Sequence, residues 1–306
     1  MNSVVSIVVC TRNRAADIRE TLQSLSEIDC PQEFSVEILV IDNGSTDDTQ
    51  AVLQELGIRS FVAPIPGVAR ARNAGIANAT GDPVVFVDDD LRFPKDWLVD
   101  ILAEFERGAD AVAGAIRLAP HLLRPWMTAK HREMLGSTEL YDETGEVGLH
   151  GGAMAFRKRV FERVPTFDEE LGVGAIGSSE EQLFAHQLQE AGFYIAANKS
   201  PVEHHCSPDL LKHENLVRRS FNVGKSQAYI DYHWRHDENI ISRAKTLRIW
   251  LGFLKRKFFS KKGRENHVEA FEVDYHVGRG YRTQLSVEVI RPRNYEKRGL
   301  CKLKRG

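Results

Sequence analysis

Three consecutive carboxylates, Asp88, Asp89 and Asp90, follow the apolar run at 83–87. Adjacent negative charges repel one another and cannot lie in a core without partners, so they occupy either a solvated turn or a place beside a cation. Carboxylates at the end of a strand suit Mg²⁺ or Mn²⁺, which bind one or two of them together with substrate phosphates. Because side chains alternate along a strand, we expect Asp88 and Asp90 to point the same way, with Asp89 turned aside.

Polar residues also follow two other apolar runs. The stretch C-T-R-N-R at 10–14 ends the run that begins at residue 4, and Asp42 follows the run at 36–41. A carboxylate in the position of Asp42 can accept hydrogen bonds from a nucleobase or a ribose. The alternative is a turn in which one of residues 45–47 caps the next helix, and both interpretations can hold at once.

The first 115 residues alternate strand-like and helix-like segments. This alternation predicts an α/β fold with a parallel sheet and helices on both faces. Ligands bind beyond the carboxyl ends of the strands in such sheets, so the three polar strand ends should converge at one edge. The expected strands are 4–10, 36–41, 58–62 and 84–87, and the expected helices are 14–27, 51–56, 67–79 and 94–107, the last with Pro94 in its first turn.

Composition limits the class of protein and its partners. The chain has 306 residues, a net charge of -2 and 42% hydrophobic residues, which fits a globular protein without a general attraction to nucleic acid. Its four cysteines are scattered, which favours a reduced, intracellular protein. The N-terminus lacks the pattern of a signal peptide, and no apolar run reaches the roughly 20 residues of a transmembrane helix, so we expect a cytoplasmic location.

Three stretches together resemble one enzyme family. They are S-I-V-V-C-T-R-N-R at 6–14, I-L-V-I-D-N-G-S-T-D-D-T at 38–49, and G-V-A-R-A-R-N-A-G-I-A-N-A-T-G-D-P-V-V-F-V-D-D-D at 67–90. In order, spacing and residue type they are similar to the inverting family 2 glycosyltransferases. The resemblance implies the GT-A fold, which is a Rossmann-like α/β fold with a mostly parallel central sheet flanked by helices.

The resemblance also implies where a nucleotide-diphosphate sugar donor binds. By this similarity Thr11, Arg12 and Asp42 face the nucleotide. Arg72 lies in the R-A-R-N-A-G segment, which the family uses near the donor phosphates. The alternative for Arg72 is a surface position on an amphipathic helix.

The Asp triplet corresponds to the family's metal site, called DxD. The resemblance implies that Asp90 ligates Mg²⁺ or Mn²⁺ and that Asp88 faces the metal and the donor diphosphate. Asp89 joins the donor-binding group, although we expect its substitution to have the least effect of the three. A V-x-H pattern ending at His204 resembles the family's contact to metal or diphosphate.

A second matching stretch begins at the acidic pair Glu180 and Glu181. S-S-E-E-Q-L-F-A-H-Q-L resembles the family's E-D-x-x-F-x-x-R-L, which implies that Glu181 is the catalytic base and Glu180 its partner. The alternative is an ordinary acidic helix N-terminus, which the helix dipole favours. The chain departs from the family pattern because Glu181 replaces Asp and Gln187 replaces Arg. The strand G-G-A-M-A-F-R at 151–157 resembles the family's acceptor-side strand.

The last third of the chain is basic in one segment. Residues 241–264 contain nine basic residues and no acidic one, with apolar residues on one helical stripe. A basic amphipathic helix of this kind suits the surface of an anionic membrane. Such peripheral binding would make sense if the acceptor is lipid-linked. The alternative is that the helix packs its apolar stripe against the catalytic domain. Nearby, Arg218 and Arg219 either reach a phosphate or lie on a solvated helix face.

The resemblance divides the chain into three parts. We expect residues 1–115 to bind the nucleotide sugar, residues 116–207 to bind the acceptor and carry the base, and residues 208–306 to form a helical, basic C-terminal extension. Within this extension we expect helix to about residue 262 and mixed structure afterwards.

Together these features predict an inverting, metal-assisted glycosyltransferase. It would transfer a sugar from a nucleotide-diphosphate sugar to a glycan or lipid-linked acceptor in the biosynthesis of a polysaccharide, glycolipid or other cell-surface glycan. A non-catalytic nucleotide-sugar-binding scaffold of the same fold is one alternative. It stays open because Glu181 and Gln187 depart from the family pattern. A sugar nucleotidyltransferase would need a glycine-rich phosphate loop after the first strand, where C-T-R-N-R stands. A Rossmann dehydrogenase would need G-x-G-x-x-G there.

Overall fold

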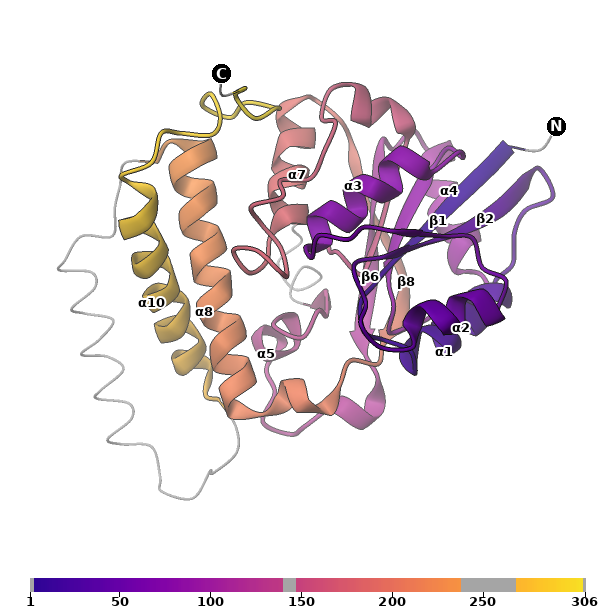
Figure 1. Cartoon of the computed structure of the whole chain (residues 1–306), viewed down its shortest axis with the longest axis horizontal. Coiled ribbons are helices and arrows are strands. Elements are labelled where there is room, and N and C mark those ends of the chain that lie inside the picture. Colours follow the sequence, from indigo (N-terminus) through magenta and orange to yellow (C-terminus); the bar gives the residue numbers. More distant parts are fainter. Residues whose placement is uncertain (1–2, 140–146, 238–267, 305–306) are drawn as a thin grey trace.

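The computed structural model describes residues 3–139, 147–237 and 268–304 (Figure 1). An eight-stranded sheet has the order β3-β2-β1-β4-β7-β6-β8-β5. Most of its pairings are parallel, and β7 is inserted antiparallel between β4 and β6. The strands are β1 Ser3–Thr11, β2 Phe34–Asp42, β3 Ser60–Val62, β4 Val84–Asp88, β5 Leu91–Arg92, β6 Ala111–Leu118, β7 Ala153–Phe156 and β8 Ile195–His204.

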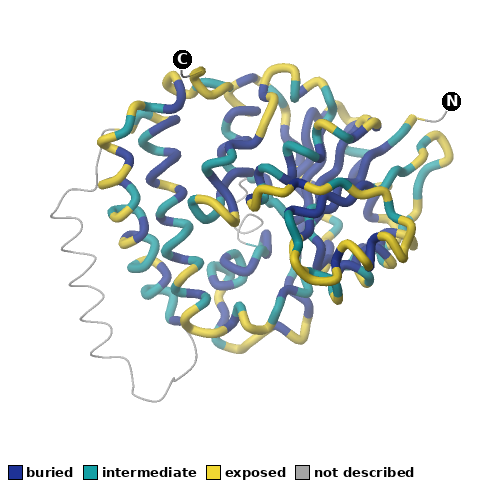
Figure 2. Tube along the Cα trace, viewed as in Figure 1, coloured by how far each residue is buried: buried dark blue, intermediate teal, exposed yellow. Residues whose placement is uncertain are grey.

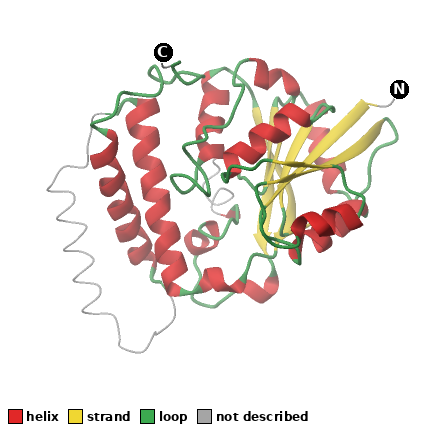
Figure 3. Cartoon of the chain, viewed as in Figure 1, coloured by secondary structure: helices red, strands yellow, loops and turns green. Residues whose placement is uncertain are grey.

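Helices cover both faces of this sheet (Figure 3). In β1, Val5, Ile7 and Val9 pack with residues of α1, α2 and α4, whereas Val8 packs with residues of α3 and α7. A strand that is buried on both faces is therefore apolar almost without interruption, as the sequence predicted. The main helices are α1 Asp17–Ser26, α2 Thr49–Glu55, α3 Val68–Asn78, α4 Trp97–Glu106, α5 Ala129–Glu133, α7 Glu180–Glu190, α8 His213–Ile230 and α10 Ala270–Glu288.

The predicted α/β fold is confirmed, with small corrections at helix starts. The helix expected from residue 94 begins at Trp97, because the Trp97 N–H donates to the carbonyl of Pro94 in a preceding turn. The helix expected from residue 14 begins at Asp17. Gly75 allows α3 to lie close to the sheet, because a methyl group at this position would overlap the Val8 side chain.

The last third of the chain contributes a pair of packed helices, α8 and α10 (Figure 1). They run in the same direction, since His213 lies near Glu272 at their beginnings and Tyr232 near Val289 at their ends. After residue 262, where mixed structure was expected, the described residues form α10 and then turns and irregular chain; Val273 and Gly280, seven residues apart, are both buried in α10. The basic stretch 241–264 lies outside the described residues.

A stability prediction follows from the contact between these helices. Alanine at Gly280 would overlap the carbonyl of Phe221, whereas alanine at Gly278 meets only the flexible end of Arg282. We expect Gly280→Ala to lower the free energy of unfolding by about 1–3 kcal/mol through overpacking. Gly278→Ala should be neutral or stabilise by up to about 1 kcal/mol, because alanine favours helices. Urea unfolding of the two variants measures the difference, and equal stabilities would contradict the close contact.

Buried polar groups fasten the C-terminal residues to the sheet domain. The Asp168 carboxylate accepts hydrogen bonds from Tyr229 and Tyr295, both at 2.7 Å, and lies 2.5 Å from the Lys302 ammonium. Gln187 of α7 donates to the carbonyls of Gly299 and Leu300. The buried core, shown in dark blue in Figure 2, therefore continues from the sheet into α7 and α8. Within the described residues, no helix has the length and apolar character needed to cross a membrane.

Candidate active site

A pocket of about 180 Å³ lies where the carboxyl ends of β4 and β8 meet the start of α7. It joins residues that are far apart in the sequence. Five of the predicted site residues line it together with His150 and Arg219: Arg72, Asp88, Glu180, Glu181 and His204. Of the three polar strand ends expected to converge, the Asp triplet lines this pocket through Asp88; Thr11 and Arg14 contact the triplet, and Asp42 lies in register with Thr11.

Asp88 and Asp89 point in different directions at the end of β4. The Asp88 carboxylate lines the pocket, 3.7 Å from Nη2 of Arg72. The Asp89 carboxylate is buried and accepts a 2.6 Å hydrogen bond from the Thr11 hydroxyl. Asp89 is thus turned aside, as alternation predicted, but it connects β4 to the end of β1. Substitution of Asp89 would leave Thr11 without this bond. That Asp89 tolerates substitution best of the three stays a prediction.

Asp90 is held between two basic side chains. Oδ1 of Asp90 lies 3.1 Å from Nε2 of His204, and Oδ2 lies 3.4 Å from Nη2 of Arg14. Burial alone would raise the pKa of Asp90, but the hydrogen bond and charge of His204 outweigh burial and lower it. Burial would likewise lower the pKa of His204, and Asp90 raises it. Asp90 and His204 therefore form a hydrogen-bonded pair, of which His204 lines the pocket.

Arg14 is a site residue that the sequence interpretation missed. It lies 3.7 Å from Asp89 as well as 3.4 Å from Asp90. Its presence in C-T-R-N-R was the available signal, but only the turn between β1 and α1 brings it to the Asp triplet. Cationic groups on two sides, Arg14 and Arg72, explain how three adjacent carboxylates can lie together.

Arg72 is buried, so the interpretation as a surface arginine is wrong. It forms an ion pair with Glu180 and approaches Asp88 with its other terminal nitrogen. A methyl group at Gly151 would overlap its guanidinium, so the glycine makes room for the side chain. Arg72 therefore connects the Asp triplet at the end of β4 to the acidic pair at the start of α7.

The acidic pair begins α7, preceded by Ser179 with a left-handed backbone (φ 70°). Glu180 and Glu181 are both buried, and the ion pair to Arg72 compensates the charge of Glu180. Burial, followed by the charge of Glu180, raises the pKa of Glu181 well above its ordinary value. Such a carboxylate accepts a proton more readily than an exposed one, as a general base near neutral pH must.

The predicted nucleotide residues lie at the ends of β1 and β2. Thr11 pairs in register with Asp42, and both are buried, whereas Arg12 is exposed. Oδ1 of Asp42 accepts a hydrogen bond from the Ser45 N–H at 2.9 Å. Asp42 therefore supports a turn through one oxygen, and its other oxygen, Oδ2, is buried without a hydrogen-bond partner among the described residues.

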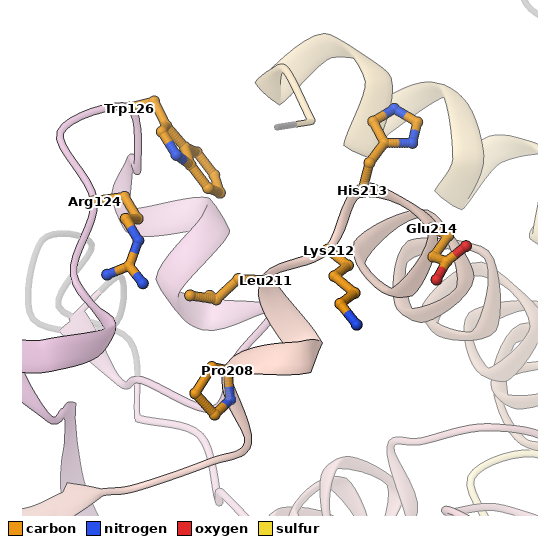
Figure 4. Close-up of a pocket in the computed structure, with 7 residues that line it drawn as sticks. All are labelled: Arg124, Trp126, Pro208, Leu211, Lys212, His213 and Glu214. Atoms are coloured by element: carbon orange, nitrogen blue, oxygen red, sulfur yellow. The ribbon is translucent and has the colours of Figure 1, made fainter. Parts of the chain in front are cut away.

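A second, more open cavity of about 650 Å³ lies apart from these residues (Figure 4). Its walls come from the segment around Trp126, from the 3-10 turn at 208–211 and from the start of α8, and they carry basic, acidic and apolar side chains. The residues that line it are Arg124, Trp126, Pro208, Leu211, Lys212, His213 and Glu214.

Comparison with known proteins places this geometry in a family. The model of Glycosyl transferase family 2 matches residues 6–164, just over half of the chain. Succinoglycan biosynthesis protein ExoM of Rhizobium meliloti is 32% identical over 120 residues, which cover 37% of this chain and 38% of that protein. Glycosyltransferase AglE of Haloferax volcanii is 23% identical over 262 residues, which cover 82% of each. The match to ExoM thus spans less than half of that relative's length.

A solved structure supports the fold. The mannosyltransferase PcManGT from Pyrobaculum calidifontis, in complex with GDP-Man and Mn²⁺, matches with a TM-score of 0.55 and 15% identity, over 95% of this chain and 76% of that one. The predicted GT-A fold is thereby confirmed. From the family match and this fold, the chain belongs to glycosyl transferase family 2.

Proposed function

We propose that the protein transfers a sugar from a nucleotide-diphosphate sugar to an acceptor hydroxyl with inversion, assisted by a divalent metal. The observation that carries this proposal is that one pocket contains Asp88 and His204 together with the buried acidic pair Glu180 and Glu181. Arg72 connects the two groups, since it contacts both Asp88 and Glu180. Inversion in one displacement requires a base on the acceptor side and a stabilised leaving group on the other. The two ends of this pocket offer those two functions.

The residues at one end of the pocket fit a divalent cation. Within the described ranges, no group of three or more His, Cys, Asp or Glu side chains is arranged to hold a metal alone. However, Mg²⁺ and Mn²⁺ need only one or two protein ligands when substrate phosphates supply the others. Asp88 lines the pocket and Asp90 lies two residues further along the chain, and their carboxylate oxygens are the hard ligands that these cations prefer, while His204 would orient Asp90 through the bond from Nε2. When bound there, the metal would stabilise the charge of the departing diphosphate.

The protein's own side chains perform the remaining steps in this proposal. Glu181 accepts the proton of the acceptor hydroxyl as the oxygen attacks the anomeric carbon. Arg72 forms an ion pair with Glu180, so that the two neighbouring buried carboxylates do not both stand unpaired. Thr11 and Asp42 orient the nucleotide, with Arg12 at the exposed rim.

The regional assignments remain part of the proposal. Residues 1–115 bind the donor, 116–207 bind the acceptor and carry the base, and 208–306 form the extension. The name of ExoM supports a role in polysaccharide biosynthesis. PcManGT, which shares the fold, was solved with GDP-Man and Mn²⁺, and this supports a nucleotide sugar and a divalent metal here. A cytoplasmic location, with or without membrane contact through 241–264, stays a prediction.

The non-catalytic scaffold is less well supported than the enzyme. Its two arguments were glutamate at 181 and glutamine at 187. Gln187 donates to backbone carbonyls of the C-terminal segment and does not line the pocket. The presence of glutamine where the family has arginine therefore affects the packing of that segment and not the chemistry of the pocket. Glu181 retains a carboxylate in the pocket.

Thermal unfolding with a panel of nucleotide sugars tests the proposal. We expect one donor, with Mn²⁺ or Mg²⁺, to stabilise the wild type by about 2.7 kcal/mol at 100 times its Kd, and less in EDTA. Asp90→Asn should lose the metal-dependent part, whereas Asp96→Asn, at an exposed aspartate nearby, should keep it. Donor hydrolysis should accompany binding. Equal, zero turnover in both the wild type and Glu181→Gln, with the donor still bound, would instead favour the scaffold.

A further inference from the structure

Arg219 brings a positive charge into the pocket from outside the region that matches the family model. It belongs to α8, whereas the match ends at residue 164. Its Nε donates a 2.6 Å hydrogen bond to the carbonyl of Met134, which fixes the side chain against the residues after α5. The guanidinium then lines the pocket together with His150 and His204.

The charge of Arg219 is not balanced as those of the other arginines are. Arg72 pairs with Glu180, and Arg14 pairs with Asp90. In the described residues, no carboxylate lies within 4 Å of Arg219, and its two terminal nitrogens have no hydrogen-bond partner there. Arginine stays protonated even where burial is unfavourable, so a cation with unused donors faces the pocket.

The surroundings of Arg219 indicate which part of the ligand it meets. The acidic groups that act electrostatically on it include Asp90 and Asp88, at the metal end of the pocket. The carbonyl that Arg219 binds belongs to Met134, and Gly136, two residues further on, lies against the ring of His204, which bonds to Asp90. Arg219 therefore belongs to the end of the pocket assigned to the leaving group.

We propose that Arg219 binds the diphosphate of the donor and of the departing nucleoside diphosphate. This inference rests on the proposed function and adds a diphosphate ligand from α8. A planar guanidinium offers two parallel N–H donors to two phosphate oxygens, and the bond from Nε to Met134 leaves the terminal nitrogens for them. The C-terminal helical pair thereby becomes part of the active site, because its packing sets the position of Arg219.

The exposed neighbour Arg218 provides a matched control on the same helix. Arg219→Met, Arg219→Lys and Arg218→Met would be titrated calorimetrically with UDP, GDP and dTDP and with the corresponding nucleosides, in EDTA and in Mn²⁺. Arg219→Met should weaken binding of the preferred diphosphate by about ten- to a hundredfold, and leave nucleoside binding unchanged. Arg219→Lys should recover part of the loss, since it keeps the charge but not the fork. Arg218→Met should match the wild type.

The outcomes separate this inference from the proposed function. If the wild type binds a diphosphate and Arg219→Met binds it equally well, Arg219 is not its ligand and the inference fails alone. A loss of nucleoside affinity as large as the loss of diphosphate affinity would indicate a general disturbance of the pocket and would also overturn the inference. If the wild type binds none of the three diphosphates with or without Mn²⁺, both the inference and the proposed function fail.

Discussion

Glu181→Gln is expected to lower turnover by about 10²- to 10⁴-fold, the usual contribution of a general base, and to leave donor affinity unchanged. Glutamine fills the same volume at the start of α7 but cannot accept the proton of the acceptor hydroxyl. Donor hydrolysis or sugar transfer would measure turnover, and calorimetric titration would measure donor affinity. Glu190→Gln, at the exposed end of the same helix, is the control and should behave as the wild type does.

The pH profile gives this prediction a second readout. Burial and the neighbouring Glu180 raise the pKa of Glu181 well above its ordinary value. Only the ionised form can act as the base, so the wild-type rate should rise with pH through this raised pKa and fall as pH is lowered below it. Glu181→Gln should lack this acidic limb. A variant that kept both its rate and its limb would show that another group takes the proton.

Arg72→Leu is expected to lower the free energy of unfolding by about 3–5 kcal/mol, the usual cost of leaving one partner of a buried ion pair alone. The substitution would leave Glu180 beside Glu181 without its cation, and both carboxylates are buried. Urea unfolding at neutral pH would measure the loss. Arg70→Leu on the same helix is the control, because the ion pair of Arg70 with Glu169 is exposed and should contribute at most about 1 kcal/mol.

A double variant shows whether this cost arises from the unpaired charge. Adding Glu180→Gln to Arg72→Leu removes the carboxylate that lost its partner, so the double variant should be more stable than Arg72→Leu alone. If the two substitutions were simply additive, the buried pair would not be the cause. The loss should also be smaller at low pH, where the carboxylates hold protons that neutralise the unpaired charge.

The sequence by itself determined the fold class and most of the chemistry at the strand ends. Apolar runs buried on both faces predicted β1, β2 and β4 to within two residues at each end. The polar residues that follow them, Asp42 and Asp88, lie at the carboxyl edge, as parallel strands require. These features are local, because a strand and the residues that end it adjoin in the chain, and their motifs also carried the family resemblance.

The tertiary structure alone decided which charges compensate one another. Arg72 and Glu180 are 108 residues apart, and no periodicity in either helix indicates that they meet. Arg219 likewise reaches the pocket only because α8 packs beside the residues that end α5. Whether an arginine is solvated, paired or available for an anion depends on the desolvation and partners created by packing, and these are not properties of its neighbours in sequence.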